Sequence, residues 1–169
     1  FMNVFLVGYK TTLQYIRLLL DVLWGIPSIV YGAFGFSIML WLGMRSSLLA
    51  GIIVVALLII PIMIRTMDEA MRHIPYELME VSYALGANTT ETAFLVYFRY
   101  SITSFFTAFL LAFGRGIGDA ASVLFTVGYT DYIPTSLSQP TATLPLAIFF
   151  QLGSPIQAVK DRAFAAALI

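Results

Sequence analysis

The sequence predicts an all-α, polytopic membrane protein, chiefly because of its composition and of two long uncharged segments. Hydrophobic residues make up 60% and charged residues 11% of the 169 residues, and the mean hydropathy is +0.90. Soluble domains contain about 45–50% apolar and about 25% charged residues. The uncharged segments hold 23 residues between Asp21 and Arg45 and 19 residues between Arg45 and Arg65. Because a helix needs roughly 20 apolar residues to cross a bilayer, each segment predicts one membrane-spanning helix.

These first two membrane helices, expected over residues 22–44 and 46–64, form a hairpin because only a short break at Arg45–Ser47 separates them. The first contains four glycines that allow close approach of helix backbones: Gly25, Gly32, Gly35 and Gly43. Pro27 suits a helix start. Pro61 lies deep in the second helix and should kink it or end its regular hydrogen bonding.

A third membrane helix is expected from about Ala93, where a long apolar segment begins. Three charged residues interrupt it: Arg99, Arg115 and Asp119. Arg99 lies near one end and can extend to the interface. Arg115 follows 16 residues later, which is about 24 Å along an ideal helix. We therefore expect Arg115 to lie deep in the membrane.

The C-terminal part is expected to contain a loop, a short helix and the start of a fourth membrane helix. Tyr129–Gly153 contains three prolines and little charge, which predicts a loop and then an interfacial or re-entrant helix around Leu146–Leu152. Ser154 and Pro155 are a suitable N-cap and first-turn pair for the fourth helix. Only seven residues follow Arg162, too few to cross a bilayer, so we expect this helix to continue in a longer chain.

The N-terminal residues show no cleavable signal, because no basic region precedes the apolar run and no small-residue cleavage site follows it. We expect Phe1–Gly8 to be the end of an earlier membrane helix, so that the single expected domain, residues 1–169, is truncated at both ends. Lysine and arginine positions indicate orientation. With the polar insert described below inside, the cytoplasmic residues are Lys10, Arg17, Arg65, Arg72 and Arg99, and the external ones are Arg45, Lys160 and Arg162.

Several function classes are excluded by the residues that the sequence lacks. There is no cysteine, and the single histidine, His73, has no second ligand for a metal site. The net charge is zero with scattered basic residues, which argues against nucleic-acid binding. No Gly-x-Ser-x-Gly turn or aspartate dyad indicates an intramembrane enzyme. No Walker-type phosphate loop is present, so any ATP hydrolysis must occur in another chain.

A polar insert of about residues 66–92 separates the second and third predicted membrane helices. From His73 it reads HIPYELMEVSYALGANTTET. Pro75 suits a first helical turn, and Glu77 and Glu80 complement the positive N-terminal end of a helix dipole. Apolar side chains recur at helical spacing: Tyr76, Met79 and Tyr83. The insert therefore predicts a helix of about three turns.

A sharp corner should end this helix. Gly86 directly follows the last periodic residue, Leu85, as a C-terminal stop. Asn88 with Glu91 three residues later resembles a capping box and predicts that a second helix starts at once and continues into the third membrane helix. From physics alone, such an insert is most simply a surface loop containing a satisfied helix.

The insert resembles the cytoplasmic loop of ABC-importer permeases, which carries the EAA motif. Glu80-Val81-Ser82, Gly86 and Val96–Arg99 keep the spacing of that motif, although Ser82 replaces a small alanine and Arg99 stands where the family usually has proline. The resemblance implies a coupling helix seated in a groove of a cytoplasmic ATPase subunit. It assigns coupling roles to Glu80, Ser82, Gly86 and Ala87.

Two further stretches resemble the permeases of phosphate-specific ABC importers. DVLWGIPSIVYGAFGF, from Asp21, is similar to the helix before the coupling hairpin, and GRGIGDAASVLFT, from Gly114, is similar to an Arg-x-x-Gly-Glu segment with Asp119 in place of glutamate. LPLAIF followed by DRAFAAAL looks closer to the A-type subunit (PstA) than to its C-type partner (PstC). The resemblance implies a type I, MetI-like ABC importer transmembrane domain with about four membrane helices in this chain.

Arg115 and Asp119 are the candidate residues of an oxyanion path. At i, i+4 spacing they should share a helix face, and an arginine deep in a bilayer, which costs about 2.5–3.5 kcal/mol, normally faces protein or a water-filled path. Its guanidinium suits phosphate oxygens. Gly116 and Gly118 would let backbone amides line the passage. Asp119 would repel phosphate, so we assign it as partner or gate. The alternative is an ion pair that only neutralises Arg115.

These expectations describe a multi-pass permease subunit of an ATP-driven phosphate importer in the inner (plasma) membrane. The implied partners are a cytoplasmic ATP-binding subunit, a second permease subunit, identical or different, an extracytoplasmic phosphate-binding protein and the lipid bilayer. No cofactor is expected in this chain, because ATP and magnesium belong to the ATPase. A permease for another oxyanion or small solute is the nearest alternative, and a scaffold or channel subunit without ATP coupling is a more distant one.

Overall fold

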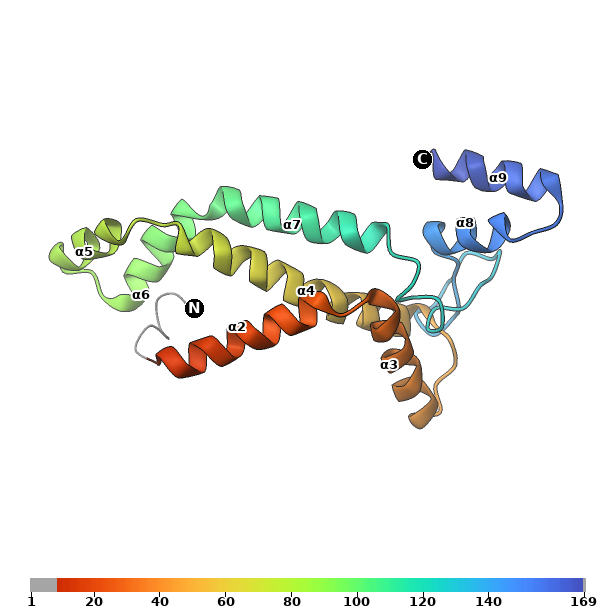
Figure 1. Ribbon diagram of the computed structural model, residues 1–169, viewed down its shortest axis with the longest axis horizontal. Helices are drawn as coiled ribbons and strands as arrows, with labels where there is room; N and C mark the ends of the chain where they lie inside the picture. The colour runs from red at the N-terminus through yellow and green to blue at the C-terminus, as the bar shows by residue number, and fades with distance from the viewer. Residues whose placement is uncertain (1–8, 169) are drawn as a thin grey trace. The chain divides into compact units, whose positions relative to one another are not determined.

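The computed structural model describes residues 9–168, and every regular element within them is a helix, as predicted (Figure 1). The elements are α2 (Lys10–Gly25), α3 (Ser28–Trp41), α4 (Leu48–Arg72), α5 (Tyr76–Ala84), α6 (Thr89–Glu91), the π-helix η1 (Thr92–Phe98), α7 (Ile102–Ile117), α8 (Leu144–Leu152) and α9 (Gln157–Ala167). The predicted end of an earlier helix, Phe1–Gly8, lies outside the described residues.

The chain divides into two compact units. One consists of Phe1–Gly25 and Ile60–Phe113, and the other of Ile26–Ile59 and Gly114–Ile169. The first unit therefore holds α2, the second half of α4 and the coupling segment, which we define as residues 73–98. The second unit holds α3, the first half of α4 and the chain from the end of α7 onward.

One described helix, α4, is by itself long and apolar enough to cross a membrane. Two broken helix pairs, α2 with α3 and α6–η1 with α7, bring the number to three if each pair counts as one span. The predicted continuous helix over residues 22–44 is therefore wrong. The chain leaves the helix at Ile26 and Pro27 because proline lacks an N–H donor and disfavours helical backbone in the residue before it.

Helix α4 is longer than its uncharged segment. It continues past Arg65 to Arg72 and contains Pro61 without ending there. The start of the predicted insert, at about residue 66, is thus helical. Its polar side chains remain satisfied within the helix and by ion pairs, as when Thr66 Oγ1 donates to the carbonyl of Ile62 at 2.9 Å. Polarity here marks the end of the membrane-facing surface, not the end of the helix.

In the second unit, the segment that follows α7 caps the N-terminus of α4. The first N–H groups of a helix have no partner inside it, and in a bilayer no water replaces that partner. Three of these donors bond to loop carbonyls and one to the side chain of Ser47. The bonds are Ser47 N to Thr126 O (3.0 Å), Leu48 N to Gln139 O (2.8 Å), Leu49 N to Leu137 O (2.8 Å) and Ala50 N to Ser47 Oγ (3.3 Å).

Glycines in α3 and α4 allow this capping segment to pack closely. A Cβ at Gly32 would lie 2.7 Å from the carbonyl oxygen of Ser122, and one at Gly51 would overlap a methyl group of Val127. Val123, Val127 and Leu146 form the buried core beside them. The glycines of residues 22–44 were predicted to allow close approach of another backbone. Gly32 does so, and the backbone that approaches it is the non-helical chain at Ser122.

The predicted short helix near Leu146–Leu152 is present as α8, and α9 follows it (Figure 1). The predicted N-cap is wrong. Helix α9 starts at Gln157 with Ile156 as its N-cap, because the Ser154 hydroxyl accepts the N–H of Ile156 at 3.3 Å and so closes a local turn before the helix.

Gly32→Ala should destabilise the protein by about 1–3 kcal/mol, because the added methyl group meets a backbone oxygen that cannot rotate away. The midpoint of thermal unfolding of the purified protein in detergent measures the effect. Gly25→Ala is the matched control, since nothing lies within 4 Å of its added Cβ. Equal midpoints for the two variants would contradict the packing described here.

Candidate functional site

The coupling segment is built around a glycine corner. Helix α5 starts after Pro75 and ends at Ala84; Leu85 is its C-cap, and Gly86 follows with φ of +85°. The N–H of Gly86 donates to the carbonyl of Tyr83 at 2.9 Å, and that of Ala87 donates to the carbonyl of Ser82 at 3.1 Å. The predicted stop at Gly86 is confirmed, because the left-handed backbone that closes the corner strongly favours glycine.

The predicted capping box is also confirmed. Asn88 Oδ1 accepts the N–H of Glu91 at 2.9 Å, and Glu91 Oε2 accepts the N–H of Asn88 at 2.8 Å. Helix α6 is only three residues long and continues into η1. The capping box therefore fixes the direction in which the chain leaves the corner.

One face of α5 is buried within the coupling segment itself. Met79 packs with Ile74 and Tyr97 in a small core, and the Tyr97 hydroxyl lies 3.7 Å from the sulfur of Met79. The hydroxyls of Ser82 and Thr92 are 2.9 Å apart and buried. Helix α5 is thereby fixed to η1 along the side that carries Met79 and Ser82.

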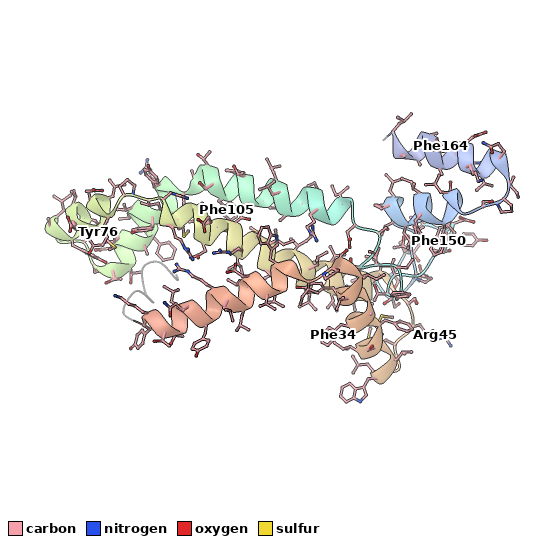
Figure 2. All side chains as sticks on the ribbon, in the orientation of Figure 1. Phe34, Arg45, Tyr76, Phe105, Phe150 and Phe164 are labelled. Atoms are coloured by element: carbon pink, nitrogen blue, oxygen red, sulfur yellow. The ribbon has the colours of Figure 1, made fainter. Side chains whose placement is uncertain are left out.

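The remaining surface of α5 is exposed and largely apolar. Tyr76 projects from this helix (Figure 2), and Leu85 at its end is 83% exposed. Of the predicted coupling residues, Glu80 and Gly86 are exposed, Ala87 is partly buried and Ser82 is buried. Ser82 thus holds α5 in place from inside, whereas Glu80 lies on the face that is open to a partner.

The chain bends where Arg99 stands in place of the proline of the related motif. The helical segments Thr89–Phe98 and Ile102–Ile117 meet at 67°. Ser101 Oγ donates to the carbonyl of Tyr97 at 2.8 Å and lies 3.3 Å from that of Phe98. A π-helical stretch followed by a serine bonded to the preceding turn accounts for a bend without proline.

Arg115 and Asp119 do not share a helix face, which corrects the prediction of an i, i+4 pair. Helix α7 ends at Ile117, and no ion pair joins the two side chains in the described part of the chain. Asp119 Oδ2 instead accepts the N–H of Ser122 at 3.0 Å and starts the turn that leads into the capping segment. Arg115 is exposed in the last turn of α7, where its charge complements the helix dipole.

The glycines beside Arg115 differ in their surroundings. A Cβ at Gly116 would lie 2.5 Å from the end of the Ile59 side chain, so this position is a packing contact. Gly118 is exposed, and its N–H donates to the carbonyl of Gly114 at 3.3 Å. The run of glycines helps to end the helix before Asp119, because each glycine weakens a helical turn.

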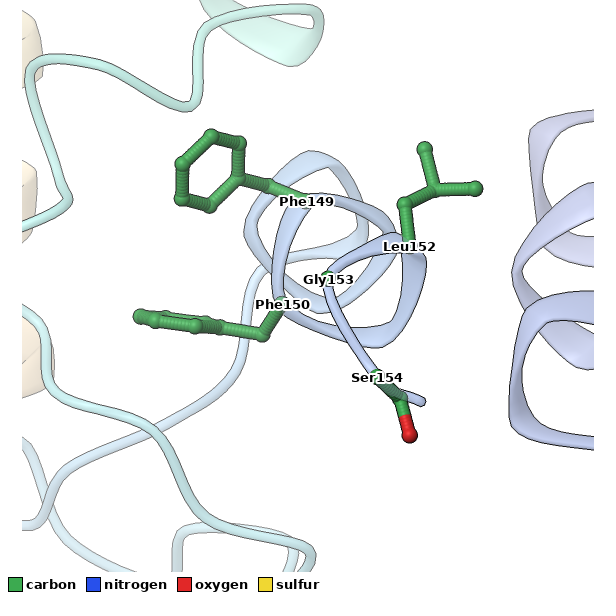
Figure 3. A pocket seen from close by; sticks show the side chains of 5 residues that line it. All are labelled: Phe149, Phe150, Leu152, Gly153 and Ser154. Atoms are coloured by element: carbon green, nitrogen blue, oxygen red, sulfur yellow. The ribbon is translucent and has the colours of Figure 1, made fainter. Parts of the chain in front are cut away.

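A pocket of about 580 Å³ at the end of α8 does not offer an oxyanion site (Figure 3). Phe149, Phe150 and Leu152 line it with Gly153, and Ser154 supplies its only polar side chain. A phosphate needs several charged or polar donors. The pocket lacks a cationic side chain, so we do not place the substrate path there.

The sequence matches the family model for the binding-protein-dependent transport system inner membrane component over residues 7–167. This chain belongs to that family. The match covers nearly all described residues, including the coupling segment and Arg115. The all-α, MetI-like fold class predicted from the sequence is that of the family.

The chain is also similar to individual members of the family that are named as phosphate permeases. The chain is 35% identical to the phosphate transport system permease protein PstA of Yersinia pestis over 153 residues, which is 90% of this chain and 52% of the relative. It is 32% identical to the PstA protein of Haemophilus influenzae over 95% of this chain and 57% of the relative. It is 37% identical to the phosphate transport system permease protein PstA 1 of Mycobacterium tuberculosis over 88% of this chain and 49% of the relative.

The chain spans about half the length of these curated relatives. The resemblance to phosphate importer permeases noted from the sequence is thus confirmed. No solved structure matches the chain significantly.

One structural feature of this family member was not predicted from the sequence. Asp68, near the end of α4, is almost fully buried and accepts hydrogen bonds from Arg17 of α2 and Arg72 of α4. The helical spacing of Arg65, Asp68 and Arg72 was a visible signal for part of this cluster. The contact of Arg17 with Asp68 could be seen only in the tertiary structure, because the two residues are 51 positions apart in the sequence.

Gly86→Ala should open the corner of the coupling segment, because an L-residue in left-handed backbone costs roughly 1–2 kcal/mol. We expect amide hydrogen exchange at residues 82–91 to become about 5- to 30-fold faster. Gly114→Ala, with nothing within 4 Å of its Cβ, should leave exchange in that segment unchanged. Unaltered exchange in Gly86→Ala would show that the corner does not depend on its glycine.

Proposed function

We propose that this chain forms the transmembrane domain of the permease subunit of an ATP-driven phosphate importer, multi-pass in the inner membrane. The observation that carries the proposal is the coupling segment. A short helix, α5, is anchored on its Met79 and Ser82 side, and its exposed surface carries apolar side chains together with the carboxylates of Glu77 and Glu80. Similarity to permeases named for phosphate transport supplies the substrate class.

The exposed face of α5 suits a groove on a cytoplasmic ATP-binding subunit. Tyr76, Val81 and Leu85 offer large apolar side chains, and exposed Glu80 adds a charge for orientation. Amphipathic helices bind grooves through a few such anchors. Ser82, Gly86 and Ala87 act indirectly in this proposal, because their bonds set the position and the end of α5.

Arg115 is the residue that we assign to the phosphate path. Its exposed guanidinium stands at the end of α7 and makes no ion pair among the described residues, so it can present donors to an oxyanion. We keep Asp119 as a candidate gate beside this path, and its carboxylate also caps the following turn. Gly116 and Gly118 act indirectly in this proposal. Gly116 lets α7 pack against Ile59, and Gly118 lies just after the end of the helix.

The proposal includes three protein partners: the ATP-binding subunit, a second permease subunit and an extracytoplasmic phosphate-binding protein. The chain itself acts as a transport subunit and not as an enzyme, with ATP and magnesium bound by the ATPase. A related permease for another oxyanion is the second candidate, because a guanidinium binds sulfate-like anions with the same fork of donors.

Leu85→Asp should weaken binding of the ATP-binding subunit by about 10- to 100-fold, because an apolar anchor of roughly 1.5–3 kcal/mol is replaced by a charge. Co-purification of the ATPase with the full-length permease measures this. Folding should be unaffected, since Leu85 is exposed.

The control is Ile133→Asp, an equally exposed apolar side chain in the loop between α7 and α8. It should retain the ATPase like the parent protein. Equal retention by both variants would mean that α5 is not the docking helix, and a parent protein that binds no ATPase would refute the coupling role altogether.

Arg115→Gln should lower phosphate uptake by about 10- to 100-fold, because hydrogen bonds to a charged group contribute about 1.5–3 kcal/mol. The measurement is uptake of labelled phosphate by proteoliposomes that contain the assembled complex. Arg45→Gln, an exposed arginine between α3 and α4 (Figure 2), is the control. Uptake equal to that of the parent in a well-assembled Arg115→Gln complex would remove Arg115 from the path.

A further inference from the structure

The first unit contains a compact network of charges at the end of α4 that precedes the coupling segment. Its centre is Asp68, whose side chain is 2% exposed. Three arginines approach this carboxylate. Arg17 Nε lies 2.9 Å from Oδ2, Arg72 NH2 lies 3.1 Å from it and Arg65 NH1 lies 3.7 Å from it. The second oxygen, Oδ1, accepts a bond from Arg17 NH2 at 3.2 Å.

Two further carboxylates in the described part of the chain, Asp21 and Glu69, belong to the network. Arg65 forms an ion pair with Asp21 of α2 and lies 3.6 Å from Glu69, which also approaches Arg72 at 3.8 Å. The three arginines are thus matched by three carboxylates, from α2 and α4 together. Asp68 is the buried member of this set, and its charge can be buried because arginines donate hydrogen bonds to it.

The network connects two elements that are far apart in the sequence. Arg17 and Asp21 belong to α2, and the other members belong to the last two turns of α4. Immediately after Arg72 the chain enters the coupling segment, and Met71 packs against its core of Ile74, Met79 and Tyr97. Any displacement of α5 therefore acts on the same helix end that Asp68 ties to α2.

We propose that Asp68 is a positioning residue that clamps α2 to the end of α4, so that α2 moves together with the coupling segment during the transport cycle. This inference rests on the proposed function of the coupling segment. Asp68 is suited to the role because, among residues 9–168, it is the carboxylate that contacts arginines of both helices from a buried position. Without the Asp68 carboxylate, the three guanidiniums would lie close together. Their remaining counter-charges would be Asp21 and Glu69, which are partly exposed to solvent.

The clamp can be tested directly by a distance. This chain has no cysteine, so Tyr15→Cys and His73→Cys, both exposed, provide unique spin-label sites within it on α2 and at the start of the coupling segment. In the assembled complex, the label distance should be the same without nucleotide and with trapped ATP. With Asp68→Asn added, the distribution should broaden and differ between the two states. A distance that already changes with nucleotide in the parent complex would overturn the proposal.

Transport provides the second readout. The Asp68→Asn complex should retain its ATPase but transport about tenfold less phosphate per ATP hydrolysed, since coupling between sites commonly amounts to 5- to 150-fold. Glu69→Gln is the matched control, because Glu69 is the next residue of α4, is 52% exposed and makes only the longer contacts. It should stay within about twofold of the parent. Equal phosphate per ATP in Asp68→Asn and Glu69→Gln would refute the clamp.

Two further variants cover the case in which Asp68→Asn does not assemble. Arg17→Gln removes the contact of Asp68 to α2. The α4 arginines around Asp68 and the ion pair of Arg65 with Asp21 remain, so this variant should show the same loss of coupling in milder form. Arg17→Lys keeps the positive charge and should recover part of the coupling between ATP hydrolysis and phosphate transport. A normal phosphate-to-ATP ratio in Arg17→Gln overturns the clamp. A parent complex that binds no ATPase and takes up no phosphate refutes instead the proposed function.

Discussion

The need to satisfy backbone donors and acceptors inside the protein governs most of this structure. In the hydrocarbon core of a bilayer, an unpaired N–H or C=O group has no water to bond, so a helix end that lies there requires a partner from the protein. The N-terminus of α4 obtains its partners from the carbonyls of Thr126, Leu137 and Gln139. The irregular segment after α7 therefore caps the N-terminus of α4, and the glycines of α3 and α4 leave space for it to pack closely.

The same constraint applies to charges. In the first unit, charges of α2 and of the end of α4 form ion pairs, and the most deeply buried of them, Asp68, is bonded to arginines of both helices. The pairing determines which helices are held together in the first unit. It also places a cluster of ion pairs next to the coupling segment, whose own position depends on the bond between Ser82 and Thr92 and on the corner at Gly86.

The candidate site was only partly predictable from the sequence. The glycine stop and the capping box at Asn88 and Glu91 were predicted correctly, because both are local and depend on residues at most four positions apart. The pairing of Arg115 with Asp119 was wrong because it assumed that one helix continues through three glycines. Local spacing cannot show where a helix ends when the competing turn is stabilised by contacts with distant residues, as the turn at Ser122 is by its packing against Gly32.

By itself the sequence determined the all-α class, the membrane environment, the family and the order of its polar and apolar segments. These properties follow from composition, from helix-length apolar runs and from motif spacing, all of which act along the chain. Only the tertiary structure decided that residues 22–44 break at Pro27, that Ser82 faces inward, and that Arg17 joins Asp68 across 51 residues. Such contacts depend on which helix faces meet, and that choice is made by packing and by the pairing of buried charges, not by any local pattern.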